Sequence, residues 1–225
     1  MIVPIVNQWF RPENVIDVGC GVGAWLEVWK EQPNILEVMG LDARFVHSEF
    51  MRVDIDNEFV EVDLNESLPK LKRFDIAVCL EVAEHLKPER AESFVQDLTT
   101  LSNIILFSAA IPGQEGTQHI NEQFLGYWIK IFLNHGYDCY DVIRPIIWNN
   151  KSVAWWFRQN TVLFIKNTLD LDLDLDSMQS FNGFDMVQKD LLKYKERKYY
   201  KLVNRKNKVR RVISRIKRIF TKNRQ

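Results

Sequence analysis

Short apolar runs alternate with amphipathic stretches through about residue 166. The runs are rich in β-branched and aromatic residues and are bounded by polar residues or Gly, which is typical of buried strands. We therefore predict five strands, at 14–19, 35–42, 59–64, 74–80 and 103–111. Apolar positions at helical spacing predict helices at 23–32, from Pro88 to 101, and at 121–136.

Two further apolar segments, 137–147 and 155–167, follow without a clear helix between them. They predict an antiparallel pair that closes the sheet. Strands that alternate with helices predict an α/β fold with a doubly wound, mostly parallel sheet of seven strands. In such sheets ligands bind beyond the carboxyl ends of the strands, where the polar loops of this chain fall.

The net charge of zero conceals two opposed parts. Residues 188–225 hold 16 Lys or Arg and 2 Asp or Glu, whereas residues 1–187 hold 14 basic and 28 acidic residues. Between the domain at 1–168 and this basic tail, residues 169–187 include the alternating tract DLDLDLD. That tract could mimic a strand, but its four Asp favour a solvated acidic linker.

The basic tail, residues 188–225, predicts an amphipathic helix that needs an anionic partner. An apolar stripe favours a membrane surface over nucleic acid, although the Lys, Arg and Tyr residues upstream would also suit a phosphate backbone. A solvated charged helix is the remaining alternative. The stripe consists of Val209, Val212, Ile213, Ile216, Ile219 and Phe220.

The chain of 225 residues shows no apolar run long enough to span a membrane, and its first ten residues lack the basic start of a secretory signal. Its three cysteines, Cys20, Cys79 and Cys139, share no metal-ligand spacing. We expect a cytoplasmic protein that is peripheral to the inner face of the membrane.

A glycine-rich turn links the first strand to the first helix in VIDVGCGVGAW. Gly19, Gly21 and Gly23 permit a tight turn and close approach of a ligand to backbone N–H groups. The same letters satisfy the dinucleotide fingerprint G-x-G-x-x-G/A, which is weak when it stands alone. The turn by itself therefore leaves two cofactor classes open.

Three acidic residues favour one of them. Asp17 lies two residues before the first glycine, where it can attract a cationic ligand group rather than a pyrophosphate. Asp42 ends the second predicted strand, where it can accept hydrogen bonds from ribose hydroxyls. Asp63 ends the third predicted strand, where its carboxylate can accept a hydrogen bond from an adenine amino group. Basic residues that would favour a diphosphate are missing from the turn.

With these motifs in order, residues 14–166 resemble the class I S-adenosylmethionine-dependent methyltransferases. The resemblance implies that the three glycines line the methionine moiety and that Asp17 orients the turn and the amino group. It further implies that Asp42 holds the ribose, and that Asp63 and Leu64 hold the adenine. An NAD-dependent oxidoreductase is the alternative from a different class, and a non-catalytic adaptor with this fold is a third.

The stretch EVAEHL follows the fourth predicted strand. The resemblance implies that Glu81, its first residue, lies near the sulfonium of the cofactor. With Glu84, His85 and a later His119, it resembles the metal site of RNA methyltransferases that modify a 3′-terminal ribose 2′-hydroxyl, although the spacing to His119 is shorter here. All four residues could bind Mg²⁺ or Mn²⁺. Alternatively, His119 or His85 is a general base without a metal, or Glu84 and His85 only begin a helix and pack.

The segment from 112 to 128 and the aromatic region after it resemble a bacterial subgroup associated with surface-polysaccharide assembly. We therefore expect an O-methyltransferase that acts on a sugar hydroxyl of a surface or lipid-linked glycan, with an RNA ribose as the alternative acceptor. A cluster of aromatic side chains is compatible with a sugar-stacking wall or with a packed core. The cluster comprises Trp148, Trp155, Trp156 and Phe157, with Arg158 beside them.

Overall fold

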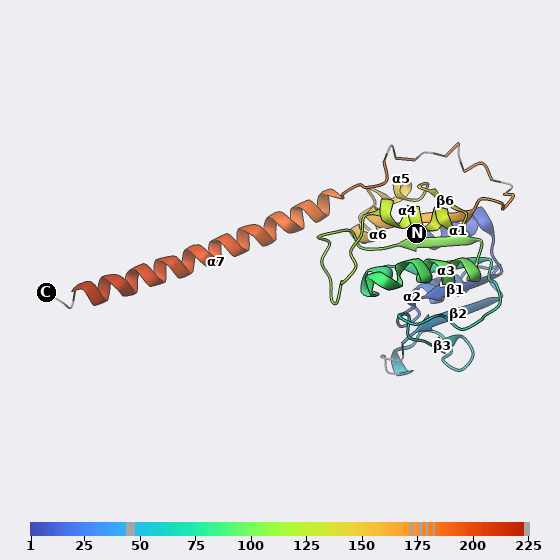
Figure 1. The fold of residues 1–225 in the computed structure, drawn as a ribbon, viewed down its shortest axis with the longest axis horizontal. Helices are drawn as coiled ribbons and strands as arrows, with labels where there is room; N and C mark the ends of the chain where they lie inside the picture. The colour runs from blue at the N-terminus through green and yellow to red at the C-terminus, as the bar shows by residue number, and fades with distance from the viewer. Residues whose placement is uncertain (44–47, 172, 176, 179, 182, 223–225) are drawn as a thin grey trace. The chain divides into compact units, whose positions relative to one another are not determined.

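The computed structural model describes the backbone of residues 1–43, 48–171, 173–175, 177–178, 180–181 and 183–222 (Figure 1). Within these ranges, it does not describe the side chains of Ser48, Arg205 and residues 207–222. The chain divides into two compact units, Met1–Met186 and Val187–Gln225. The first is an α/β unit and the second consists mainly of one helix.

Seven strands form one sheet in the order β3-β2-β1-β4-β5-β7-β6. The first five strands in this order are parallel, whereas β7 runs antiparallel to β5 and β6 runs antiparallel to β7. This arrangement confirms the predicted sheet and its closing pair. The strands are β1 (Asn14–Val18), β2 (Glu37–Asp42), β3 (Phe59–Glu61), β4 (Ile76–Leu80), β5 (Ile104–Ser108), β6 (Tyr137–Tyr140) and β7 (Val162–Lys166).

Helices cover both faces of the sheet because successive strand residues point to opposite sides. On β4, Ala77 and Cys79 join the core beneath α3 and α4, whereas Ile76 and Val78 join the core beneath α1 and α2. The helices are α1 (Ile2–Phe10), α2 (Ala24–Lys30), α3 (Ala91–Leu101), α4 (Leu125–Asn134), α5 (Arg144–Ile147) and α6 (Trp155–Asn160), with short 3-10 turns η1 (Ser48–Phe50), η2 (Ala83–His85) and η3 (Pro88–Arg90).

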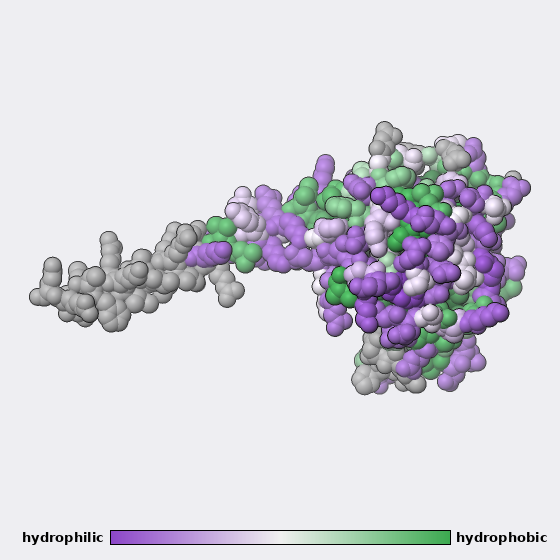
Figure 2. All heavy atoms as spheres, viewed as in Figure 1, coloured by the Kyte–Doolittle hydropathy of each residue, from purple (hydrophilic) through white to green (hydrophobic). Residues whose placement is uncertain are grey.

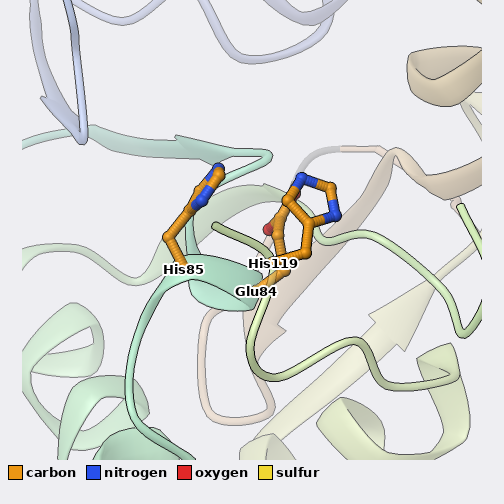
Figure 3. Close-up of side chains that lie close together, drawn as sticks. All are labelled: Glu84, His85 and His119. Atoms are coloured by element: carbon orange, nitrogen blue, oxygen red, sulfur yellow. The ribbon is translucent and has the colours of Figure 1, made fainter. Parts of the chain in front are cut away.

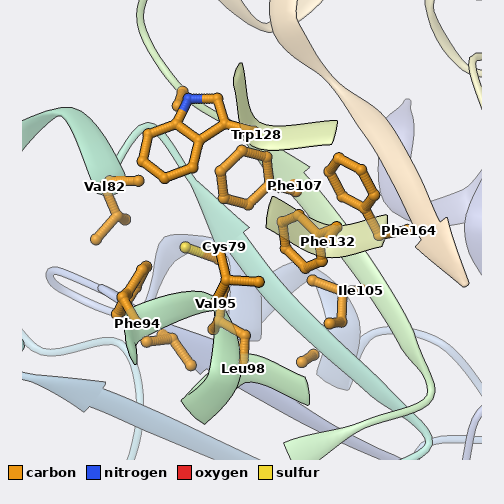
Figure 4. Packing of buried hydrophobic residues seen from close by; sticks show 14 of the residues in the cluster. Cys79, Val82, Phe94, Val95, Leu98, Ile105, Phe107, Trp128, Phe132 and Phe164 are labelled. Atoms are coloured by element: carbon orange, nitrogen blue, oxygen red, sulfur yellow. The ribbon is translucent and has the colours of Figure 1, made fainter. Parts of the chain in front are cut away.

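Aromatic rings fill the core under α3 and α4 (Figure 4). Phe132 of α4 stacks on Phe164 of β7 with ring centroids 3.8 Å apart, and Phe107 of β5 packs edge-on against both. Burial of such rings dominates the stability of a core. Hydrophilic side chains cover most of the face of this unit that is turned to the viewer in Figure 2.

The closing pair is shorter than predicted, because the end of segment 137–147 and the start of segment 155–167 form the helices α5 and α6 between β6 and β7. Pro145 in the first turn of α5 suits a helix start. Arg144 also forms a buried bidentate ion pair with Asp141, with Nε–Oδ1 and Nη2–Oδ2 distances of 2.7 and 2.6 Å. The aromatic residues of α6 resembled a strand because they are apolar in succession, although Trp156 is exposed on the helix.

The prediction of a solvated acidic linker is also wrong. Leu175 is only 4% exposed, and three preceding leucines, Leu169, Leu171 and Leu173, pack against the core beneath α1 and α2. Further along, Asp185 Oδ1 accepts a hydrogen bond of 2.8 Å from the N–H of Gly126 at the start of α4. The described residues between 169 and 186 therefore form a strap on the α/β unit, and Leu169, Leu171, Leu173 and Leu175 anchor it.

The basic tail contains a single helix, α7 (Lys189–Lys222), which agrees with the predicted helix. The apolar stripe predicted at 209–220 falls on side chains outside the described part of the chain. Among the described residues, the structure contains no helix with the length and apolar character needed to cross a membrane.

Candidate active site

A pocket of about 520 Å³ opens beyond the carboxyl ends of β1, β2 and β4. Six of the predicted cofactor residues line it, namely Gly19, Gly21, Asp42, Asp63, Leu64 and Glu81. The other two do not line it: Asp17 lies in β1, and Gly23 is the N-cap of α2. Further lining residues that the motifs did not single out include Asn65, Thr117 and Gln118.

The glycine turn is held by backbone bonds and by tight packing. The N–H of Gly19 donates to the carbonyl of Leu41 over 2.7 Å, and its φ of +83° lies in the left-handed region. A Cβ at this position would lie 2.3 Å from Cγ2 of Val82. Gly21 also has a positive φ, and its N–H donates to Oδ2 of Asp42 over 2.7 Å.

The predicted acids occupy different surroundings. Asp42 ends β2 and also accepts from the N–H of Ala43 over 2.7 Å, whereas Asp63 lies past the end of β3, which is shorter than predicted. Asp17 is almost fully buried, and its Oδ2 has no hydrogen-bond partner. Burial, reinforced by the carboxylate of Asp42, raises the pKa of Asp17 to about 8. A cationic group of a bound ligand would relieve this burial cost.

Glu81, which follows β4, adopts a φ of +58° that non-glycine residues rarely take. Its carboxylate accepts hydrogen bonds from Nδ2 of Asn160 over 3.0 Å and from Nε2 of Gln114 over 2.5 Å. Burial raises the pKa of this carboxyl, and the amide donors oppose that effect. These contacts hold the carboxylate of Glu81 at the two amides, and among the described residues Glu81 is not one of those whose possible ligand atoms converge.

Three residues of the expected metal site do converge (Figure 3). One ligand atom from each of Glu84, His85 and His119 lies within 4.8 Å of the other two. Glu84 and His85 belong to η2, and His119 belongs to the loop between β5 and α4. The backbone of that loop is tied to η2, since the N–H groups of Ile120 and Asn121 both donate to the carbonyl of Glu84.

The donor set of this cluster fits a divalent cation. Glu84 is fully buried, and neither of its carboxylate oxygens has a hydrogen-bond partner. Burial and the nearby Glu81 raise the pKa of Glu84 to about 9. Partial desolvation of the ring and the neighbouring His119 lower the pKa of His85, which favours its neutral imidazole. A bound cation would stabilise the ionised carboxylate of Glu84 beside the neutral imidazole of His85.

Sequence reasoning missed Glu122, which lies three residues after His119 and contacts its Nδ1. The signal available was the spacing H-x-x-E before a helix. The aromatic cluster at 148–158 supplies no lining residue to the pocket in the described structure. Phe157 packs against the core and Arg158 is buried, which favours the packed-core alternative for these two. His135 caps the C-terminus of α4 and contacts Glu92.

Comparison with known proteins gives a family match for about half of the chain. Residues 5–111 match the family model of the methyltransferase domain. None of the curated proteins compared with it matches the sequence. The family match favours the methyltransferase alternative over the NAD-dependent oxidoreductase.

Several solved structures share the fold at low sequence identity. A small RNA methyltransferase HEN1 is 16% identical with a TM-score of 0.55, over 83% of this chain and 26% of that one. A SAM dependent methyltransferase from Archaeoglobus fulgidus is 18% identical with a TM-score of 0.53, over 73% and 91%. The methyltransferase domain of bacterial CtHen1-C is 16% identical with a TM-score of 0.51, over 73% and 93%. The TM-scores show a common fold.

Proposed function

We propose that this methyltransferase transfers the methyl group of S-adenosylmethionine to a sugar hydroxyl bound at the cluster of Glu84, His85 and His119. The observation that carries the proposal is the position of the cluster. His85 belongs both to the cluster and to the lining of the pocket that the cofactor motifs form. An acceptor hydroxyl bound at the cluster would therefore lie beside the cofactor.

The residues of the cluster would hold a divalent cation. One carboxylate with two imidazoles offers both oxygen and nitrogen donors. This mixed set suits Mn²⁺ better than Mg²⁺, because Mg²⁺ prefers oxygen ligands alone. When bound, such a cation supplies positive charge that lowers the pKa of a coordinated hydroxyl. The glycine turn and Asp42 would hold the cofactor, and the pocket would align its methyl group with the acceptor oxygen.

A glycan hydroxyl is the first candidate acceptor, and a ribose 2′-hydroxyl of RNA is the second. The glycan proposal rests on the sequence resemblance to the polysaccharide-associated subgroup. The RNA candidate is favoured by the convergence of Glu84, His85 and His119, and it is compatible with a fold shared with a small RNA methyltransferase. Both acceptors present a sugar hydroxyl beside a second hydroxyl, so the chemistry at the cluster would be the same.

A panel of acceptors tests this function. The full-length protein is incubated with Mn²⁺, methyl-labelled S-adenosylmethionine and either nucleotide sugars, lipid-linked glycans or RNA with a free 3′-terminal diol. We expect label on a sugar oxygen of one class, and no label when periodate has removed the diol of that acceptor. If the periodate-treated acceptor is still labelled, and the label resides on a nitrogen or a carbon, the proposal is contradicted.

We also propose that the basic tail binds an anionic membrane surface. The tail is basic along its whole length, and in the described residues the helix exposes Tyr194, Tyr199 and Tyr200 together with most of its lysines. Helical spacing in the sequence places the stripe at 209–220 on one side. A basic helix with such a stripe is typical of helices that lie in the membrane interface.

Two charge-matched variants of the full-length protein test the tail. Changing Ile213 and Ile216 of the stripe to Asp should lower sedimentation with phosphatidylserine vesicles by at least about tenfold, because two apolar anchors are lost. Changing Asn207 and Ser214, which helical spacing places opposite the stripe, to Asp adds the same charge and should have a smaller effect. Equal losses would show that charge alone acts and would argue against insertion of the stripe.

A further inference from the structure

We propose that Glu122 is a positioning residue that holds His119 with its Nδ1 protonated and its Nε2 turned toward Glu84 and His85. This inference deepens the proposed function, because it concerns how one member of the cluster is prepared to bind a cation. It assigns a role to a carboxylate that touches neither the pocket nor the other two members of the cluster in the contacts of the described residues.

The contacts of Glu122 are specific. Its Oε1 lies 3.0 Å from Nδ1 of His119 and accepts a hydrogen bond of 2.8 Å from the N–H of Glu115. Its Oε2 accepts a hydrogen bond of 2.7 Å from the N–H of Gly113. The side chains of Glu122 and His119 are 19% and 11% exposed, so solvent competes little for these bonds.

Hydrogen-bond chemistry then selects the tautomer of His119. A carboxylate only accepts hydrogen bonds, so the ring nitrogen beside it must be the donor. The proton therefore resides on Nδ1, and Nε2 of the neutral ring keeps its lone pair. Figure 3 shows the ring of His119 beside that of His85, and the two ring centroids are 4.8 Å apart. A carboxylate behind a ligating histidine is a frequent arrangement in metal sites.

The loop supplies a second restraint on the ring. A Cβ on Gly116 would lie 2.0 Å from Nε2 and 2.4 Å from Cε1 of His119, so the ring rests against a bare backbone. Two non-glycine residues of the same loop, Glu115 and Gln118, adopt φ values of +61° and +59°. Such conformations cost free energy and persist only when surrounding contacts hold them, as the bonds from Glu122 do.

The first test reads the tautomer directly in the metal-free, full-length protein by nitrogen-15 NMR of the histidine side chains. We expect the Nδ1–H form for His119 in the wild type and in Glu122→Gln, whose carbonyl oxygen still accepts the bond. Glu122→Ala should populate the Nε2–H form. Glu92→Ala is the matched control, because Glu92 pairs with His135, and it should change the signals of that histidine instead. An unchanged tautomer of His119 in Glu122→Ala would overturn the proposal.

The second test measures Mn²⁺ affinity of the same variants by calorimetry. Glu122→Ala should weaken binding by about 10- to 100-fold, as is typical when the partner of a ligating histidine is lost. Glu122→Gln should bind within about threefold of the wild type, because its carbonyl oxygen still accepts from Nδ1 of His119 and only the bond from the N–H of Gly113 is lost. A wild-type protein that binds no Mn²⁺ would contradict the cation site of the proposed function, and the tautomer measurement would still decide the role of Glu122.

Discussion

Replacing Glu84 with Gln is expected to lower methyl transfer by about 10³-fold, equivalent to about 4 kcal/mol of transition-state stabilisation. The amide keeps the shape of the side chain but removes the anionic ligand from the cluster. The affinity for S-adenosylmethionine should stay within about threefold, because the buried carboxylate of Glu84 is not among the residues that line the described pocket. Initial rates with the acceptor identified in the panel, and calorimetry with the cofactor, measure the two effects.

The controls separate a cation site from general-base catalysis. A chelator should abolish methyl transfer by the wild type, and added Mn²⁺ should restore it, if the cluster holds a cation. Glu89→Gln makes the same change at an exposed carboxyl near η2 and should leave the rate unchanged. A severe loss in His119→Ala together with a mild effect of Glu84→Gln, and no response to chelation, would establish the general-base alternative instead.

Replacing Gly19 with Ala is expected to destabilise the α/β unit by about 2–5 kcal/mol. Two costs add: a left-handed backbone at φ +83°, and a new methyl group 2.3 Å from the side chain of Val82. Val82 is buried in the core and cannot move aside freely. Urea unfolding of the cofactor-free protein measures the loss.

Gly21 is a matched control for this change. Its φ is +55°, but no heavy atom of another part of the chain lies within 4 Å of the Cβ that an alanine would add. Gly21→Ala should therefore cost only about 1–2 kcal/mol, the backbone part alone. Val82→Ala in the Gly19→Ala background should recover some of the additional loss. Equal destabilisation by the two alanines would show that crowding at Val82 is unimportant.

The sheet and the cofactor turn could be predicted from the sequence because their signals are local. Each strand is a short apolar run, and the end of β2 at Asp42 coincides with a change from apolar to polar residues. The helix α6 could not be predicted in this way. Its run of Trp155, Trp156 and Phe157 is apolar at every position, although the two tryptophans are partly exposed and Phe157 packs inward.

The surroundings of Glu81 lay beyond the reach of motifs for a different reason. Its two amide partners, Gln114 and Asn160, are 33 and 79 residues away in sequence and are brought together only by the closing of the sheet. Motif spacing placed Glu81 with Glu84 and His85, because all three occupy one short segment. The direction of the Glu81 side chain depends on the positive φ of this residue, which the amino-acid sequence does not reveal.

The strap at residues 169–186 defines where this enzyme can be shortened. A chain cut at residue 168 would leave the apolar surface beneath Leu171, Leu173 and Leu175 in contact with water. It would also deprive the start of α4 of its partner Asp185, and the guanidinium of Arg144 of the carbonyl of Phe184. Exposed apolar surface of this kind promotes aggregation. The shortest soluble fragment for crystallisation or isotope labelling is therefore expected to end after Met186.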